Sequence, residues 1–317
     1  RLMTIRTNPW GNMPESTQRR VKSDTQHGLF WMTDLEGKYG FLLQSKDLFD
    51  DVKLPANLKG IELLKRNSSY GYGELFLVLN DKEDWQIFYA LCNDLVSIAD
   101  SFDTDKAMIS ATEVRLKRWQ QLLKQNRDMV MSLQEQMGLF TELLCLKDII
   151  TPKYGVEQAI ISWVGADSDK QDFLLDKAII EVKSYKTSKG QTAHISSIKQ
   201  LISDKTPLFL LTYGLTETEN GYSVADIVGD INIQLKLESN EIKNIFENKL
   251  LEYGYIPETI KTPLYKFIID KSRVFLTSGD FPKIQPSCIK YGVMDVKYSI
   301  DLLECADFEK NVSNFLG

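Results

Sequence analysis

Two acidic residues and a lysine on neighbouring apolar segments form the most chemically informative pattern in this chain. Asp172 precedes Phe-Leu-Leu, and Glu181 and Lys183 lie in the Ile- and Val-rich segment that follows. Both segments are short and rich in branched or aromatic side chains, which is typical of buried strands. If they form a hairpin that turns about residues 176–177, position 172 pairs with position 181. Because side chains alternate along a strand, Asp172, Glu181 and Lys183 then share one face.

Carboxylates gathered on such a face can bind a divalent cation. Unpaired charges are costly among apolar side chains, and a bound cation offsets that cost. Mg²⁺ prefers oxygen ligands, neutralises the charge of a phosphodiester and lowers the pKa of bound water. An ammonium group beside the metal stabilises negative charge at the phosphorus and positions the attacking water. The pattern therefore favours metal-dependent hydrolysis of a phosphodiester.

A third carboxylate comes from the helix predicted over residues 133–150. Glu142 borders the apolar stripe of this helix, so it needs a partner, and the proposed metal ion would be one. Glu135 and Glu157 remain alternative acidic donors. The stripe consists of Leu139, Leu143, Leu146 and Ile150.

The order of these residues resembles the PD-(D/E)XK nuclease superfamily, in which a helix supplies an acid, one strand an aspartate and the paired strand Glu-x-Lys. The local sequence is similar to restriction-like bacterial members over about residues 133–215. The resemblance rests on Trp163-Val164-Gly165, Gln171-Asp172-Phe173, Ile180-Glu181-Val182-Lys183-Ser184 and Ile198-Lys199-Gln200-Leu201.

The resemblance implies an α/β (α+β) fold with a restriction-endonuclease-like core, in which helices flank a mixed sheet. It also implies Mg²⁺-dependent hydrolysis, with Mn²⁺ as a possible substitute. Asp172 and Glu181 would bind the metal, and Glu142 would complete the site directly or through a metal-bound water. Lys183 would orient or deprotonate the attacking water, and Gln200 would assist from the following helix.

The pattern departs from the family at one position and has a rival elsewhere. Gln171 stands where many members have proline, which weakens the signature without removing the chemistry. Asp-x-Lys also occurs at Asp295–Lys297, after Asp280-Phe281, but no further helix and strand follow it there. The structural alternative for Asp172, Glu181 and Lys183 is a solvated hairpin edge with a salt bridge.

Any surface for nucleic acid must be local, because the net charge of the chain is −6. Lys186 and Lys189 follow the hairpin in a polar loop and are candidates for phosphate contacts. Lys199 and His194 belong to the next predicted helix; capping or solvent exposure is the alternative for His194. A second basic stretch either binds DNA or is a solvated face around a core aromatic. It comprises Arg115, Lys117, Arg118, Lys124 and Arg127 around Trp119.

Three domains are predicted: an N-terminal α+β module (1–105), a nuclease core with preceding helices (106–215) and a C-terminal α/β extension (216–317). Pro152 is expected to end the helix over 133–150. Other predicted helices cover residues 84–99, 112–127, 195–203 and about 241–253. Predicted strands lie within 28–45, 60–80, 207–213, 223–237, 266–277 and 291–302, and a polar loop covers 184–191.

Composition limits the remaining possibilities. The 317 residues are 43% hydrophobic and 26% charged, as in ordinary soluble proteins. Two histidines and four scattered cysteines make a Cys/His zinc site a poor interpretation and favour a reducing cytoplasm. No apolar run approaches the length of a membrane span, so no membrane partner is expected.

Together these observations predict a Mg²⁺-dependent DNA endonuclease in a prokaryotic restriction or phage-defence system. Cleavage of both strands favours a homodimer, and the resemblance implies helicase, ATPase or methyltransferase subunits as partners. The N-terminal module would supply target recognition or subunit contacts. One alternative is a catalytically silent nuclease-fold subunit that binds nucleic acid or scaffolds a defence complex. Another is a general α/β scaffold with a fortuitous match.

Overall fold

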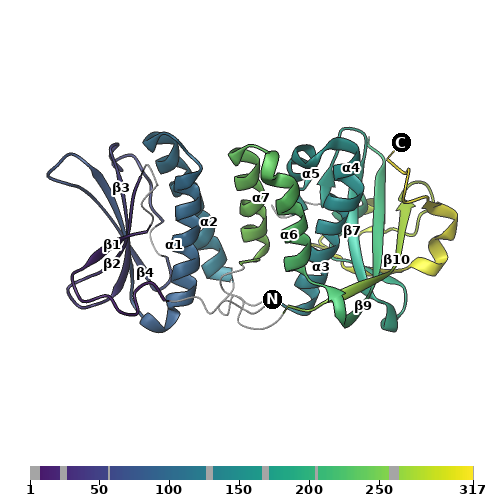
Figure 1. The fold of residues 1–317 in the computed structure, drawn as a ribbon. Helices are drawn as coiled ribbons and strands as arrows, with labels where there is room; N and C mark the ends of the chain where they lie inside the picture. The colour runs from purple at the N-terminus through teal and green to yellow at the C-terminus, as the bar shows by residue number, and fades with distance from the viewer. Residues whose placement is uncertain are drawn as a thin grey trace. The chain divides into compact units, whose positions relative to one another are not determined.

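The computed structural model of the chain describes residues 8–21, 27–55, 58–125, 131–165, 171–203, 206–256 and 264–316. The chain forms two compact units, which Figure 1 colours along the sequence. The first unit contains residues 1–130 and 254–261, and the second contains residues 131–253 and 262–317. Each unit has a five-stranded sheet among its described residues.

This division differs from the sequence-based boundaries after residues 105 and 215. Helix α2 (Asp105–Gln125) packs against α1 (Trp85–Asp100), so it belongs with the first unit. Strand β9 (Leu208–Tyr222) runs through residue 215 and pairs with β10 (Phe267–Leu276). The predicted C-terminal extension therefore continues the sheet of the predicted core.

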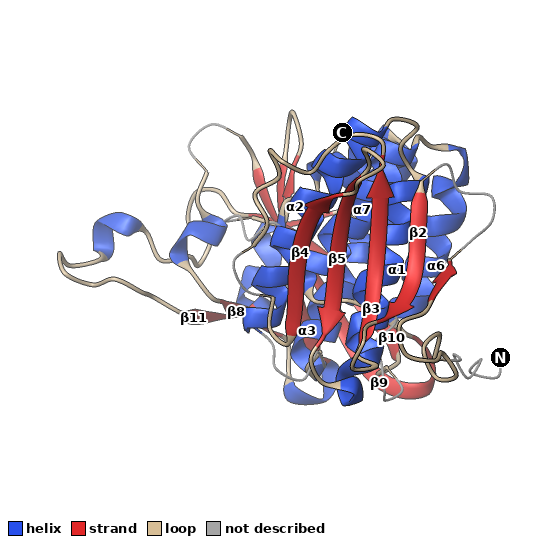
Figure 2. Ribbon diagram, turned by 90° about the vertical axis from the view of Figure 1, so that its left-hand side faces the viewer, coloured by secondary structure: helices blue, strands red, loops and turns tan. Residues whose placement is uncertain are grey.

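The first unit is an antiparallel sheet with α1 behind it, as Figure 2 shows. Trp31 is buried and its ring contacts Tyr89 of α1, which places the apolar face of the sheet against this helix. The strand order is β1-β2-β3-β5-β4. The strands are β1 (Gln18–Arg20), β2 (Gly28–Thr33), β3 (Tyr39–Ser45), β4 (Ile61–Asn67) and β5 (Gly73–Leu79).

The basic stretch on α2 is anchored by a carboxylate of α1. Arg115 is only 1% exposed and its Nη1 donates to Asp94, whose other oxygen accepts from Trp119 Nε1 at 2.7 Å. Burial raises the pKa of Asp94, and the charge of Arg115 opposes that shift. Trp119 and Arg115 therefore belong to the core of the first unit, which favours the structural alternative. Arg127 lies outside the described residues.

The second unit is built on a mixed sheet of order β12-β10-β9-β7-β6. β7 (Ile179–Lys186) pairs parallel with β9 and antiparallel with β6 (Phe173–Leu174). β10 pairs antiparallel with β9 and with β12 (Glu309–Lys310). A separate pair joins β8 (Thr192–Ile195) to β11 (Tyr298–Asp301).

The first helix of the second unit runs past the proline that was expected to end it. α3 (Leu133–Leu144) continues through a π-helical turn (Cys145–Ile150) into α4 (Thr151–Tyr154). The amide of Thr151 donates to Leu146, one residue farther back than in an α-helix. Pro152 is the second residue of α4 and so lies in its first turn, where proline is tolerated. The helix ends at Gly155, whose φ is +83°.

The strand predicted over 223–237 is instead helix α6 (Val224–Gln234), so that prediction was wrong. Ser223 and Asp226 form a reciprocal capping box at its start. The buried side chains recur at helical spacing, at Val224, Ile227, Val228 and Ile231. The other helices of this unit are α5 (Val156–Ser162) and α7 (Asn240–Tyr253).

Three shorter predictions also need correction. The polar loop begins later than expected, because β7 continues to Lys186. The helix predicted over 195–203 is the end of β8 followed by a 3-10 turn (Ile198–Leu201), which Ser197 caps. The strand predicted over 291–302 is reduced to β11, since residues 291–297 find no pairing strand among the described residues. No helix in the described part of the chain is long and apolar enough to cross a membrane.

Replacing Arg115 with alanine is expected to destabilise the first unit by about 3 kcal/mol, because Asp94 would remain buried without its main cation. Lys117→Ala is the matched control: Lys117 pairs with Glu113 on the exposed face, so its loss should cost at most about 0.5 kcal/mol. Urea unfolding measures both effects. Equal effects of the two substitutions would contradict the buried role of Arg115.

Candidate active site

The hairpin has the register that the sequence predicted. Phe173 pairs with Ile180 and Leu174 with Ile179, and the amide of Leu175 donates to Ala178 at 2.9 Å. The turn therefore lies about residues 176–177, as expected. This register is confirmed, and it places position 172 opposite position 181.

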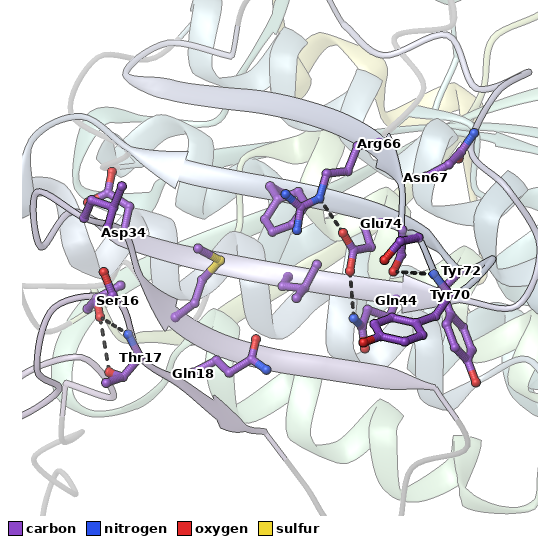
Figure 3. A pocket seen from close by; sticks show the side chains of 17 residues that line it. Ser16, Thr17, Gln18, Asp34, Gln44, Arg66, Asn67, Tyr70, Tyr72 and Glu74 are labelled. Carbon is purple, nitrogen blue, oxygen red and sulfur yellow. Dashed lines mark hydrogen bonds and ion pairs between the residues drawn. The ribbon is translucent and has the colours of Figure 1, made fainter.

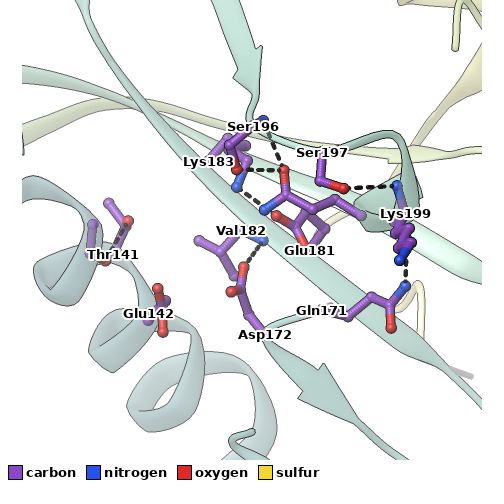
Figure 4. Close-up of polar contacts among 12 residues, drawn as sticks. Thr141, Glu142, Gln171, Asp172, Glu181, Val182, Lys183, Ser196, Ser197 and Lys199 are labelled. Atoms are coloured by element: carbon purple, nitrogen blue, oxygen red, sulfur yellow. Dashed lines mark hydrogen bonds and ion pairs between the residues drawn. The ribbon is translucent and has the colours of Figure 1, made fainter. Parts of the chain in front are cut away.

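Asp172 lies directly before β6 and is tied to the neighbouring strand. Its Oδ2 accepts a hydrogen bond from the amide of Val182 at 2.6 Å. Its own carbonyl oxygen accepts from the amides of Val164 and Gly165, at 2.9 and 3.0 Å. Figure 4 shows Asp172 beneath Val182, with Glu181 beside it. Backbone contacts thus hold Asp172 at its carboxylate and at its own carbonyl group.

Glu181 and Lys183 form an ion pair on the same face of β7. Lys183 Nζ donates to Glu181 Oε1. Glu181 is completely buried, and its Oε2 has no hydrogen-bond partner among the described residues. A buried, unpartnered carboxylate oxygen is costly and needs an explanation, and a role in binding a cation is one. The salt bridge of the structural alternative is present, but Glu181 is fully buried and Lys183 is only 18% exposed, so the pair is not a solvated edge.

Glu142 projects from α3 toward this face (Figure 4). Trp163 Nε1 donates to its Oε2 at 2.7 Å, and the hydroxyl of Tyr253 donates to its Oε1 at 2.9 Å. A Cβ built on Gly165 would lie 2.7 Å from Asp172 Oδ1 and 3.1 Å from Glu142 Oε2. The two carboxylates therefore converge on the same glycine.

The alternative acidic donors do not join this group. Glu135 caps α3, because its side chain accepts from the amide of Ser132 at 2.6 Å. Glu157 lies on the exposed side of α5. The rival motif is also absent from the site: Asp295 lies in an exposed segment outside any strand.

Burial and crowding shift the protonation of these side chains. Burial, followed by the charge of Asp172, raises the pKa of Glu142 to about 8. Burial also raises the pKa of Asp172, against the opposing charge of Lys183, and raises the pKa of Glu181 well above its usual range. Burial lowers the pKa of Lys183, but the charges of Glu181 and Asp172 outweigh it, so the net shift is upward. One ammonium group therefore faces three carboxyl groups that are all costly to ionise.

This donor set fits a hard divalent cation, since it offers carboxylate oxygens and an excess of negative charge. Asp172 and Glu181 have the freest oxygens, whereas both oxygens of Glu142 already accept hydrogen bonds. Among the described residues, no three acidic, histidine or cysteine side chains already form a complete set of metal ligands. Metal binding would therefore have to draw Glu181 away from Lys183 or use water between the carboxylates and the ion.

The two glutamines near the site have different roles. Gln171, in the position where proline was expected, donates through Nε2 to the carbonyl oxygens of Lys199 at 2.8 Å and Ile202 at 3.2 Å. It thereby ties the Asp172 segment to the 3-10 turn. Gln200 lies in that turn, and its Oε1 accepts from the amide and hydroxyl of Ser196 at 2.9 and 3.0 Å.

The four residues predicted to contact nucleic acid are spread along the chain after β7. Lys186 pairs with Glu217 at 3.0 Å, which neutralises part of its charge. Lys189 and Lys199 are exposed. His194 lies on strand β8 rather than at a helix start, and its Nδ1 bonds to Ser299 at 2.8 Å. Lys189 and Lys199 are thus the most accessible cations of this set.

A large groove of about 850 Å³ lies elsewhere, on the sheet of the first unit (Figure 3). Its buried carboxylate, Glu74, accepts from Gln44 Nε2 at 2.9 Å and from Arg66 Nε at 2.5 Å. None of the predicted site residues lines this groove. Because the guanidinium of Arg66 already compensates Glu74, the groove lacks the unpartnered carboxylate oxygen found at Glu181.

Sequence reasoning missed Trp163, Tyr253, Gly165 and Gln171 as parts of the site. Trp163, Gly165 and Gln171 stood within the quoted family resemblance, so they could have been nominated from it. Tyr253 had no such signal, because it lies 111 residues from Glu142 in sequence.

Glu142→Gln is expected to stabilise the metal-free protein at alkaline pH by about 1–3 kcal/mol. With a folded pKa of about 8, protonated Glu142 contributes stability that is complete below about pH 4.5 and lost as the pH rises through 8. A glutamine can still accept a hydrogen bond from Trp163 and donate one to Tyr253, and it does not ionise, so the variant keeps its stability at high pH. Urea unfolding of both proteins at pH 5 and pH 9, with a chelator present, measures the difference in their free energies of unfolding.

The control for that measurement is Glu157→Gln on the exposed side of α5, which should change stability little at either pH. A Glu142→Gln variant with the same stability difference at pH 5 and pH 9 would contradict the raised pKa.

Gly165→Ala is expected to destabilise the second unit by about 1–2 kcal/mol, because the added Cβ would overlap the Asp172 carboxylate. Gly229→Ala in α6 is the matched control: its Cβ would meet nothing within 4 Å, so it should stabilise the helix by up to about 1 kcal/mol. Thermal unfolding distinguishes the two. A neutral Gly165→Ala variant would show that the carboxylates do not crowd this position.

The model of the family described as "Putative PD-(D/E)XK family member, (DUF4420)" matches residues 6–303, which include every candidate site residue. No curated protein and no solved structure matches the chain. Because the match spans nearly the whole sequence, the chain belongs to the DUF4420 family of PD-(D/E)XK-like proteins.

Proposed function

We propose that this chain is a Mg²⁺-dependent endonuclease that hydrolyses DNA phosphodiester bonds with water as the nucleophile. The observation that carries the proposal is the convergence of Asp172, Glu181 and Lys183 in the predicted register, with an unpartnered oxygen on a fully buried glutamate. Membership of a PD-(D/E)XK-like family supports the same chemistry. The mixed sheet of the second unit corresponds, in this proposal, to the restriction-endonuclease-like core.

The metal would supply charge neutralisation and a water of lowered pKa when bound. Asp172 and Glu181 would be its protein ligands, and Glu142 would contribute directly or through water. Lys183 stays protonated between two acids, so we assign it charge stabilisation and orientation of the nucleophile rather than proton removal. Mn²⁺, which accepts similar oxygen ligands, would substitute for Mg²⁺.

Contacts to the DNA backbone would come from the exposed Lys189 and Lys199, and further contacts from Lys186 and His194. Gln200 would support the site from its 3-10 turn. The first unit would supply target recognition or subunit contacts. We place the protein in a prokaryotic restriction or phage-defence system of the cytoplasm, acting as a homodimer with helicase, ATPase or methyltransferase subunits.

A second candidate is a silent nuclease-fold subunit that binds nucleic acid or scaffolds a defence complex. The net charge of −6 and the direct contact between Lys183 and Glu181 favour it. The unpartnered Glu181 oxygen favours the active enzyme, because a silent site could replace this costly buried acid with an apolar residue.

Asp172→Asn and Lys183→Met are each expected to reduce Mg²⁺-dependent plasmid cleavage by about 100-fold or more, since each removes a charge that the reaction requires. Asp176→Asn and Lys177→Met are matched controls, because they change the same residue types in the exposed turn of the same hairpin. Gel assays on supercoiled DNA, linear DNA and RNA measure the rates. Undiminished cleavage by both site variants would refute the proposal, and folded wild-type protein without cleavage would favour the silent subunit.

A further inference from the structure

The carboxylate of Glu142 accepts hydrogen bonds from two side chains in other parts of the second unit. Tyr253, the last residue of α7, donates to one oxygen, and Trp163, which follows α5, donates to the other. Their rings stack with centroids 6.4 Å apart and planes inclined by 29°. Both oxygens of the carboxylate are therefore held by hydrogen-bond donors whose rings also stack on each other.

Helix α7 anchors this arrangement through further contacts. Lys249 Nζ donates to the carbonyl oxygen of Trp163, and Phe246 lies with its ring centroid 6.3 Å from the indole. These residues share one face of α7 with Tyr253, since they are spaced by three and four positions. The helix thus contacts both the backbone and the ring of Trp163. Through Tyr253 it also contacts Glu142, which accepts a hydrogen bond from Trp163.

Room for the phenol comes from a glycine on α3. A Cβ built on Gly138 would lie 2.7 Å from the hydroxyl oxygen of Tyr253, which is closer than real Cβ contacts allow. Gly138 is four residues before Glu142, so the two positions share a face of α3. Glycine costs helix stability at an interior position relative to alanine. Its presence here leaves room for the Tyr253 hydroxyl group that donates to Glu142 Oε1.

We infer that Tyr253 is a positioning residue of the metal centre, which holds Glu142 toward Asp172, and that Gly138 is small in order to admit its hydroxyl. This inference rests on the metal site of the proposed function. Carboxylates that bind metals are commonly oriented by hydrogen bonds of this kind, whose loss weakens metal affinity by about 10–100-fold. A merely structural phenol would affect stability and leave metal affinity unchanged.

The test is calorimetric titration of Mn²⁺ into the full chain. Tyr253→Phe, which removes only the hydroxyl, is expected to weaken Mn²⁺ binding about tenfold. Gly138→Ala should weaken it similarly by displacing the hydroxyl, and the same overlap should lower its melting temperature, as at Gly165. An equal loss of Mn²⁺ affinity in Tyr253→Phe, which adds no atoms and causes no overlap, would separate positioning from structural damage.

Two comparisons sharpen this result. In a Glu142→Gln background, Tyr253→Phe should produce no further loss of Mn²⁺ affinity, since the carboxylate that it positions is absent. Tyr222→Phe is the matched control, because Tyr222 is exposed at the end of β9. It should bind Mn²⁺ as wild type does.

The outcomes distinguish this inference from the proposed function. Wild-type affinity in both Tyr253→Phe and Gly138→Ala, with binding abolished by Asp172→Asn, would overturn the positioning role alone. Absence of Asp172-dependent Mn²⁺ binding in wild type would overturn both. Weakened binding in the two variants, in a protein that cleaves no nucleic acid, would support the positioning role and refute the proposed hydrolysis.

Discussion

The second unit depends on how three crowded carboxyl groups are compensated by a single ammonium group. Glu181 is fully buried, and only one of its oxygens contacts Lys183. Burial raises the pKa of Glu142, Asp172 and Glu181, so keeping all of them ionised without additional positive charge is unfavourable. A bound divalent cation would have the opposite effect, because it stabilises the ionised carboxylates that burial destabilises. The three carboxyl groups therefore lower the stability of the metal-free protein, but they are suited to binding a cation.

The surrounding fold fixes these groups through backbone contacts and neutral donors rather than through more cations. The parallel pairing of β7 with β9 buries the strand that carries Glu181 and Lys183. Asp172 is held by the amide of Val182 on that same strand. Neutral donors complete the arrangement, since an indole and a phenol orient Glu142 without cancelling its charge. These contacts leave the cost of ionising the buried Glu142 in place, and a bound cation would offset that cost.

Part of the positive charge elsewhere in the chain is committed to structure. Arg115 is buried against Asp94, and Lys186 is paired with Glu217. With a net charge of −6, attraction to a polyanion must come from a few exposed lysines near the site rather than from the whole surface. The proposed enzyme would therefore need these lysines, together with its metal ion, to bind nucleic acid.

The sequence by itself determined the hairpin register and thereby the shared face of Asp172, Glu181 and Lys183, because strand periodicity is a local property. It misassigned α6 because its alternating apolar residues also match a strand, and only the Ser223 capping box and burial along one helical stripe resolve the ambiguity. It could not assign Tyr253 to Glu142 or Gln171 to the 3-10 turn, since these contacts join residues far apart in sequence. Local spacing fixes which side chains share a strand face, whereas packing between distant helices and strands decides which donors meet them.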